Sequence, residues 1–196
     1  MKGYRPLIIA VLVVLAFSGC SKEDDEPRNQ SEYFFRYKVD GTQQDYEYGN
    51  NQTNLVGSHG YDPNTKTFAI NIAGIRNIME SGKNTVSIFI NGTEDFATGV
   101  NYSNIPGAGD DYPDFLFTMG YYDNEGNLYV AGGQGDSPIY AELYEPAFVK
   151  ITEMTGDYFS GTFSGTLIWY NTAQGKNEFI DSVVISEGTF KVPRAK

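Results

Sequence analysis

Short stretches in which every second residue is apolar dominate this sequence from Tyr33 onward. Residues 66–74 read KTFAINIAG, residues 85–91 read TVSIFIN and residues 161–170 read GTFSGTLIWY. A period of two places alternate side chains on opposite faces of a β-strand, and no stretch of a dozen residues keeps helical spacing. The pattern therefore predicts half-buried antiparallel strands with one dry and one wet face.

Turn-forming residues separate these predicted strands. Hairpin turns are expected at residues 38–42, 61–65 and 123–127, where Asp, Asn, Gly and Pro cluster. We count about ten strands and one helical turn, at residues 74–83, which we expect to be a short crossover. Little helix and many short strands predict an all-β domain, built as an antiparallel β-sandwich or a partly closed β-barrel.

The C-terminal region repeats one tripeptide. Gly-Thr-Phe occurs at residues 161–163 and again at residues 188–190. We interpret the repeat as shared strand-entry chemistry, and we expect FIDSVVI (residues 179–185) and EGTFKV (residues 187–192) to form the last pair of strands.

The N-terminus has the pattern of an export signal. Lys2 and Arg5 precede eleven apolar residues, 7–17, which are too few to cross a bilayer. Small residues and then Cys20 follow, and Cys20 is the single cysteine of the chain. A basic start, a short apolar region and small residues predict a secretory signal peptide.

Phe17-Ser18-Gly19-Cys20 resembles the lipobox of bacterial lipoproteins, and the following SKEDDE resembles the acidic export tag of surface lipoproteins of Bacteroidetes. The resemblance implies that residues 1–19 are a lipoprotein signal peptide and that Cys20 carries fatty acyl chains such as palmitate. It implies a partner, the lipid bilayer, and a location, the outer membrane with the domain exposed at the surface. Residues 20–31 are then a flexible acidic tether, and residues 32–196 a single all-β domain. The C-terminal FSGTFSGTL and VVISEGTFKVPR also resemble small Bacteroidetes lipoproteins, which implies no active site.

The charge and the cysteine count exclude several classes of function. The formal net charge is −11, which repels phosphate backbones and argues against nucleic acid as a partner. One cysteine forms no disulfide within the chain and no cysteine-based zinc site.

Catalytic residues do not stand out. His59 is the single histidine, and we expect it to be a polar residue at a strand edge. Its neighbour Ser58 must face the other side of the strand, so the two cannot form a nucleophile–base pair. We therefore predict no catalytic residue and expect a protein that is not an enzyme.

Two long connections, residues 99–113 and 131–146, are the predicted places for binding. Asp110, Asp111 and Asp114 could ligate Ca²⁺ through their carboxylates, while a solvated turn is the alternative and no other cofactor is expected. Tyrosine rings stack on sugars and peptides, so the predicted ligand-binding residues are Tyr112, Tyr140 and Tyr144.

These observations predict a lipid-anchored binding or structural module of the cell envelope, whose ligand is a glycan or a partner protein. Two alternatives stay open. One is a carbohydrate hydrolase with an acid pair, and the other is an accessory subunit of a surface complex, which an exposed apolar patch would mark.

Overall fold

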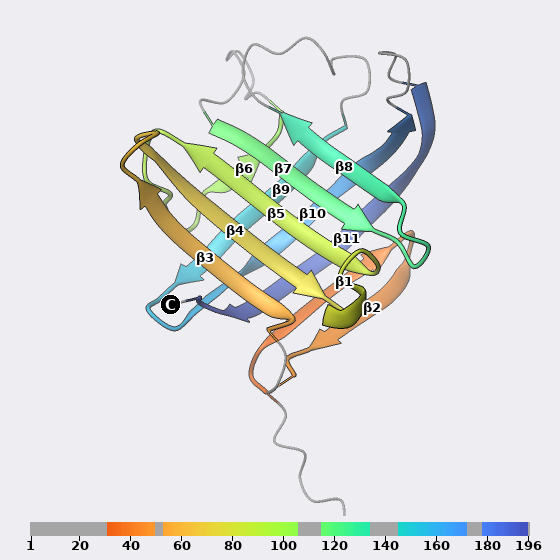
Figure 1. The fold of residues 1–196 in the computed structure, drawn as a ribbon, viewed down its shortest axis with the longest axis horizontal. Coiled ribbons are helices and arrows are strands. Elements are labelled where there is room, and N and C mark those ends of the chain that lie inside the picture. The colour runs from red at the N-terminus through yellow and green to blue at the C-terminus, as the bar shows by residue number, and fades with distance from the viewer. Residues whose placement is uncertain (1–30, 50–52, 106–114, 134–144, 172–177, 196) are drawn as a thin grey trace, which may run out of the picture. The chain divides into compact units, whose positions relative to one another are not determined.

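Eleven strands join in one antiparallel, nearly closed sheet, which confirms the predicted all-β class (Figure 1). The computed structural model describes residues 31–49, 53–105, 115–133, 145–171 and 178–195. Its strands are β1 (Phe34–Val39), β2 (Thr42–Glu47), β3 (Leu55–Asp62), β4 (Thr67–Ile75), β5 (Thr85–Gly92), β6 (Asn101–Ser103), β7 (Phe115–Tyr122), β8 (Leu128–Gly133), β9 (Ala147–Met154), β10 (Tyr158–Asn171) and β11 (Glu178–Pro193).

Strand β10 divides the sheet into two layers. Its first half, from Phe159 to Gly165, pairs with β9, and farther along Ile168 pairs with Val130 of β8. One layer has the order β2-β1-β11-β10-β9-β6, and the other has the order β8-β7-β5-β4-β3. The second layer lies in front in Figure 1, with β9, β10 and β11 behind it. Apolar side chains of both layers fill the space between them, so the interior is a packed core.

Contacts between the edge strand β3 and the end of the chain, which follows β11, join the two layers. Gly57 forms a parallel bridge with Arg194, and the Ala195 amide donates to the Gly57 carbonyl over 2.8 Å. A Cβ atom at position 57 would lie 2.5 Å from the Phe159 ring, so only glycine allows the layers to approach this closely here.

The repeated Gly-Thr-Phe tripeptides lie opposite each other in neighbouring strands. Gly161 pairs with Phe190, Thr162 with Thr189, and Phe163 with Gly188. Each phenyl ring therefore covers the glycine of the other tripeptide, on the buried side of the sheet. The repeat therefore helps to align β10 with β11. Its interpretation as shared strand-entry chemistry did not include this pairing.

The predicted last pair of strands is wrong. Residues 179–185 and 187–192 belong to a single strand, β11, whose partners are β10 and β1. Glu187 has a φ of 52°, and the register with both neighbours shifts beside it. The Glu-Gly dipeptide resembles a turn in sequence, but here it forms a β-bulge that the strand passes through.

The predicted helical turn exists, but it is not a crossover. A 3₁₀ turn at Ile78–Glu80 lies in the hairpin between the neighbouring strands β4 and β5, and Asn77 caps it by accepting from the Met79 amide. The predicted turns at 38–42, 61–65 and 123–127 connect β1 to β2, β3 to β4 and β7 to β8. No helix among the described residues has the length and apolar character needed to span a membrane.

Candidate functional site

The outward side of the layer formed by β3, β4, β5, β7 and β8 carries no charged side chain in its central rows. Strand pairing aligns these side chains in three rows that cross the layer. We call this surface the uncharged face; its residues are Ser58, Asn71, Phe89, Thr118 and Gly132 in the middle row, flanked by Val56, Ala73, Ser87, Gly120 and Val130 on one side and by Gly60, Ala69, Asn91 and Leu116 on the other.

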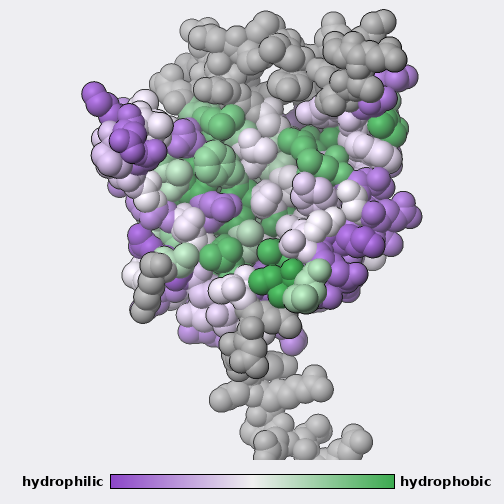
Figure 2. All heavy atoms as spheres, viewed as in Figure 1, coloured by the Kyte–Doolittle hydropathy of each residue, from purple (hydrophilic) through white to green (hydrophobic). Residues whose placement is uncertain are grey.

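Alternation explains how the sequence builds this face. Inward residues of the same strands, such as Ile70 and Ile88, are fully buried, so their neighbours must point outward. Outward positions would ordinarily hold charged residues in so acidic a protein, yet β4, β5, β7 and β8 contain no Asp, Glu, Lys, Arg or His at all. Figure 2 views this side of the molecule, where white and green residues fill most of the middle with a few purple ones among them, and purple residues are more frequent towards the margins.

The outward side of the other layer is charged instead. Arg36 forms an ion pair with Asp45 over 3.3 Å, and Lys38 forms one with Glu187 over 2.7 Å. A further ion pair joins β11 to the segment before β1. The two outer surfaces of the sheet therefore differ in kind, and solubility alone does not account for the lack of charge on one of them.

Polar groups of the uncharged face are available to a ligand. Asn71 is exposed, and Ser58 and Thr118 are partly exposed. Within the described part of the chain these three side chains make no hydrogen bond. Asn91 differs, because its amide nitrogen donates to the Thr67 hydroxyl and the Phe68 carbonyl, both over 3.1 Å.

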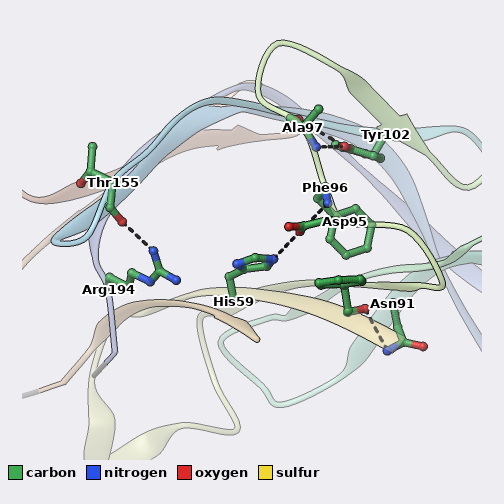
Figure 3. Close-up of polar contacts among 9 residues, drawn as sticks. His59, Asn91, Asp95, Phe96, Ala97, Tyr102, Thr155 and Arg194 are labelled. Carbon is green, nitrogen blue, oxygen red and sulfur yellow. Dashed lines mark hydrogen bonds and ion pairs between the residues drawn. The ribbon is translucent and has the colours of Figure 1, made fainter. Parts of the chain in front are cut away.

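A pocket of about 380 Å³ lies at one end of the sheet. It is bordered by the loop that follows β5 and by three aromatic rings, Phe96, Tyr102 and Phe115. Figure 3 shows the polar contacts around this loop. His59 points inward from β3, and its Nε2 lies 2.7 Å from Asp95 Oδ1. The Phe68 ring lies nearly parallel to the imidazole, with centroids 6.2 Å apart.

Tyr102 fixes the other end of this loop. Its hydroxyl accepts from the Ala97 amide over 2.7 Å and donates to the Ala97 carbonyl over 3.1 Å. Burial raises the pKa of Tyr102, and the bond from the Ala97 amide partly opposes that rise. Tyr102 and His59 thus hold the loop against the end of the sheet from opposite sides (Figure 3).

Two carboxylates, Glu94 and Asp95, lie among the lining residues of the pocket. Asp95 has 57 % of its side chain exposed and is already bonded to His59. Ser58 faces away from His59, as the sequence predicted, since successive strand residues point to opposite sides. Among the described residues no group of three or more His, Cys, Asp or Glu side chains could hold a metal ion.

All of the predicted site residues lie outside the described part of the chain. This holds for the anchor Cys20, for the tyrosines Tyr112, Tyr140 and Tyr144, and for the calcium candidates Asp110, Asp111 and Asp114. Of the aromatic residues in β1, Phe35 and Tyr37 are buried in the core. Phe34 lies on the outer side, where the Arg36 guanidinium is 4.6 Å from its ring.

The uncharged face was missed when the sequence was read for its buried positions. The sequence does contain a signal for this face. The residues that alternate with the buried ones, and so point outward, include Asn, Ser, Thr and Ala at positions where charged residues are usual. Comparison of the chain with protein-family models, with curated proteins and with solved structures finds no match.

Proposed function

We propose that this protein is a lipid-anchored binding module of a bacterial cell envelope, and that it binds through the uncharged face. The observation that carries the proposal is the lack of charge in three outward rows that cross five strands of a protein with a net charge of −11. A surface that is only solvated would gain solubility from charge, whereas a surface that binds avoids the cost of desolvating charged groups.

The proposed anchor is Cys20, joined to diacylglycerol, with residues 21–31 as a tether. Two or more acyl chains give stable attachment to a bilayer. The test is to express the full chain and the Cys20→Ser variant in a bacterium supplied with labelled palmitate. Label in the wild-type membrane fraction, and its loss in Cys20→Ser, supports the anchor; an unmodified thiol on an intact leader overturns it.

The binding role is tested by placing a charge on the face. We expect the exported Cys20→Ser chain to co-sediment with envelopes isolated from the bacterium that carries the gene. Asn71→Lys should abolish co-sedimentation, because an ammonium group would stand in the middle row. The matched control is Thr162→Lys, an exposed position on the outer side of the other layer. No co-sedimentation of the parent protein, or equal binding by Asn71→Lys, contradicts the proposal.

One observation favours the alternative of an accessory subunit. β1 ends at Val39, opposite Ile185, and Asp40 bonds both backbone groups of Val184, so β11 before Val184 has no described partner on that side. This part of β11 carries two exposed apolar residues, Phe179 and Ile180, which are 53 % and 44 % exposed, and the exposed Val184 follows it. Unpaired strand edges with apolar side chains are places where a second protein can add a strand.

A further inference from the structure

We infer that the ligand of the uncharged face is a neutral polysaccharide that stacks on Phe89. The inference rests on the proposed function and names the chemical class of its ligand. It follows from the groups around Phe89, from the size of the face and from its charge.

The first argument is the arrangement of groups in the middle row. Phe89 is partly exposed and lies between Asn71 on β4 and Thr118 on β7, each of them directly opposite it in the register. A sugar ring presents C–H groups on its faces and hydroxyl groups around its edge. An aromatic ring can stack on the C–H groups, while an amide and a hydroxyl, which both donate and accept, can bond the edge.

A second aromatic side chain extends the site along the strands. Tyr122 lies on the same outer side of β7, four residues beyond Thr118, and is partly exposed. Strand rise and strand spacing place it about 14 Å from Phe89. Two aromatic platforms at this separation fit an extended chain of several sugar units better than a single small molecule.

The size of the face argues against a protein partner. A strand spacing of about 4.8 Å and a rise of about 3.3 Å per residue give the three rows an area of about 450 Å², or about 600 Å² with the row of Tyr122 included. Stable protein–protein interfaces bury about 800 Å² on each partner. A polysaccharide does not need that area, because a few stacked rings and hydrogen bonds determine its binding.

The charge of the surroundings selects a neutral ligand. The margins carry the carboxylates of Asp62, at the end of β3, and of Asp123 and Glu125, in the turn after β7, and the whole protein is acidic. Anionic polymers would be repelled by this field, and a cationic polymer would find no charged partner in the three rows.

The test is affinity electrophoresis of the Cys20→Ser chain in native gels that contain neutral polysaccharides (a glucan, a mannan, a xylan and a galactan) or anionic ones (pectate and alginate). We expect at least one neutral polymer to retard the protein and neither anionic polymer to do so. Phe89→Ala should weaken the retardation by about tenfold or more, as expected for an aromatic anchor. Tyr122→Ala should weaken it less. The matched control is Phe34→Ala, which removes an outer aromatic ring from the charged layer.

Salt provides a second readout that a folding defect would not mimic. Because no charged group lies in the rows, the affinity should change by less than about twofold between about 50 mM and 500 mM NaCl. Retardation by none of the neutral polymers, retardation by anionic ones only, or an unchanged affinity of Phe89→Ala overturns the inference. If envelopes still bind the parent chain but not Asn71→Lys, the inference alone fails; if they do not bind it, the proposed function fails as well.

Discussion

Gly161 and Phe190 lie directly opposite each other on β10 and β11, and a Cβ atom at position 161 would come within 2.6 Å of the phenyl ring. The same atom would lie 2.3 Å from the Lys150 carbonyl oxygen of β9. The ring could turn aside, but the carbonyl belongs to the backbone of a neighbouring strand. The absence of a side chain at position 161 is therefore a condition for three strands to pair.

We predict that Gly161→Ala lowers the free energy of unfolding by about 3 kcal/mol, the upper part of the range for overpacked cores. Urea titration followed by fluorescence of the single tryptophan, Trp169, measures the change. The control is Gly60→Ala on β3, where a Cβ atom would meet nothing within 4 Å; its free energy of unfolding should stay within about 0.5 kcal/mol of the parent. Equal effects of the two substitutions would contradict the close approach of the strands.

A buried pair of tyrosines gives the second prediction. The hydroxyl oxygens of Tyr37 and Tyr46 are 2.6 Å apart in the core. Tyr46→Phe leaves the Tyr37 hydroxyl buried without this partner and should cost about 1–3 kcal/mol. The double variant Tyr37→Phe/Tyr46→Phe should be less destabilised than the sum of the single variants, because neither hydroxyl is left unpaired. A double-mutant cycle in urea checks this, and additive effects would show that the two hydroxyls do not interact.

The same pair predicts a loss of stability at high pH. Burial raises the pKa of Tyr46 to about 12 and raises that of Tyr37 as well, while the charge of Arg76 opposes both shifts. As the pH rises above 10, tyrosines of the unfolded chain lose their protons before these two do. The folded state is therefore destabilised progressively from about pH 10 to about pH 12, by about 2–3 kcal/mol for Tyr46.

Thermal unfolding measured between pH 8 and pH 12 tests this dependence. The double Phe variant should lose less stability over the range than the parent does. Tyr61→Phe serves as the control, since Tyr61 is 52 % exposed, and its profile should follow that of the parent. If the stability of the parent protein stayed constant up to pH 12, the predicted effect of the buried tyrosine pair would be contradicted.

Arg194 gives the fourth prediction. Its guanidinium donates to the Thr155 carbonyl over 2.8 Å and lies 5.5 Å from the centre of the Phe159 ring. Arg194→Ala should cost about 1–2 kcal/mol, because it removes a charged hydrogen bond and a cation–π contact. Arg36→Ala, which removes an exposed ion pair, should cost less than about 1 kcal/mol. Hydrogen exchange at the Ala195 amide should quicken in Arg194→Ala alone, and unchanged exchange there would exclude a role for Arg194 in joining β3 to the end of the chain.

The sequence predicted the strands well where alternation and turn residues agree. The buried positions Ile70, Ile72, Val86 and Ile88 and the hairpin turns between β3 and β4 and between β7 and β8 are as expected. The pairing of β5 with β7, which skips β6, could not be predicted, since period-two patterns do not specify partners. The continuity of β11 was also hidden, because the positive φ of Glu187 accommodates a bulge at a dipeptide that usually forms a turn.

The candidate site was less predictable for a different reason. Prediction relied on two long connections, residues 99–113 and 131–146. The first contains a short strand, β6, the second begins within β8, and the predicted binding residues of both lie outside the described part of the chain. The uncharged face needs five strands, and β5 and β7 have to pair although β6 separates them in the chain, before Phe89 and Thr118 become neighbours. In the sequence they are separate residues, each unremarkable at a solvent-facing position of its own strand.

The bridge between Gly57 and Arg194 joins an early strand to residues that follow the last one. A chain that emerges with its N-terminus first can form hairpins as it appears. The outer edge of β3 stays unpaired until its partners, Arg194 and Ala195, are made. A chain truncated before this bridge would keep the edge of β3 exposed to aggregation.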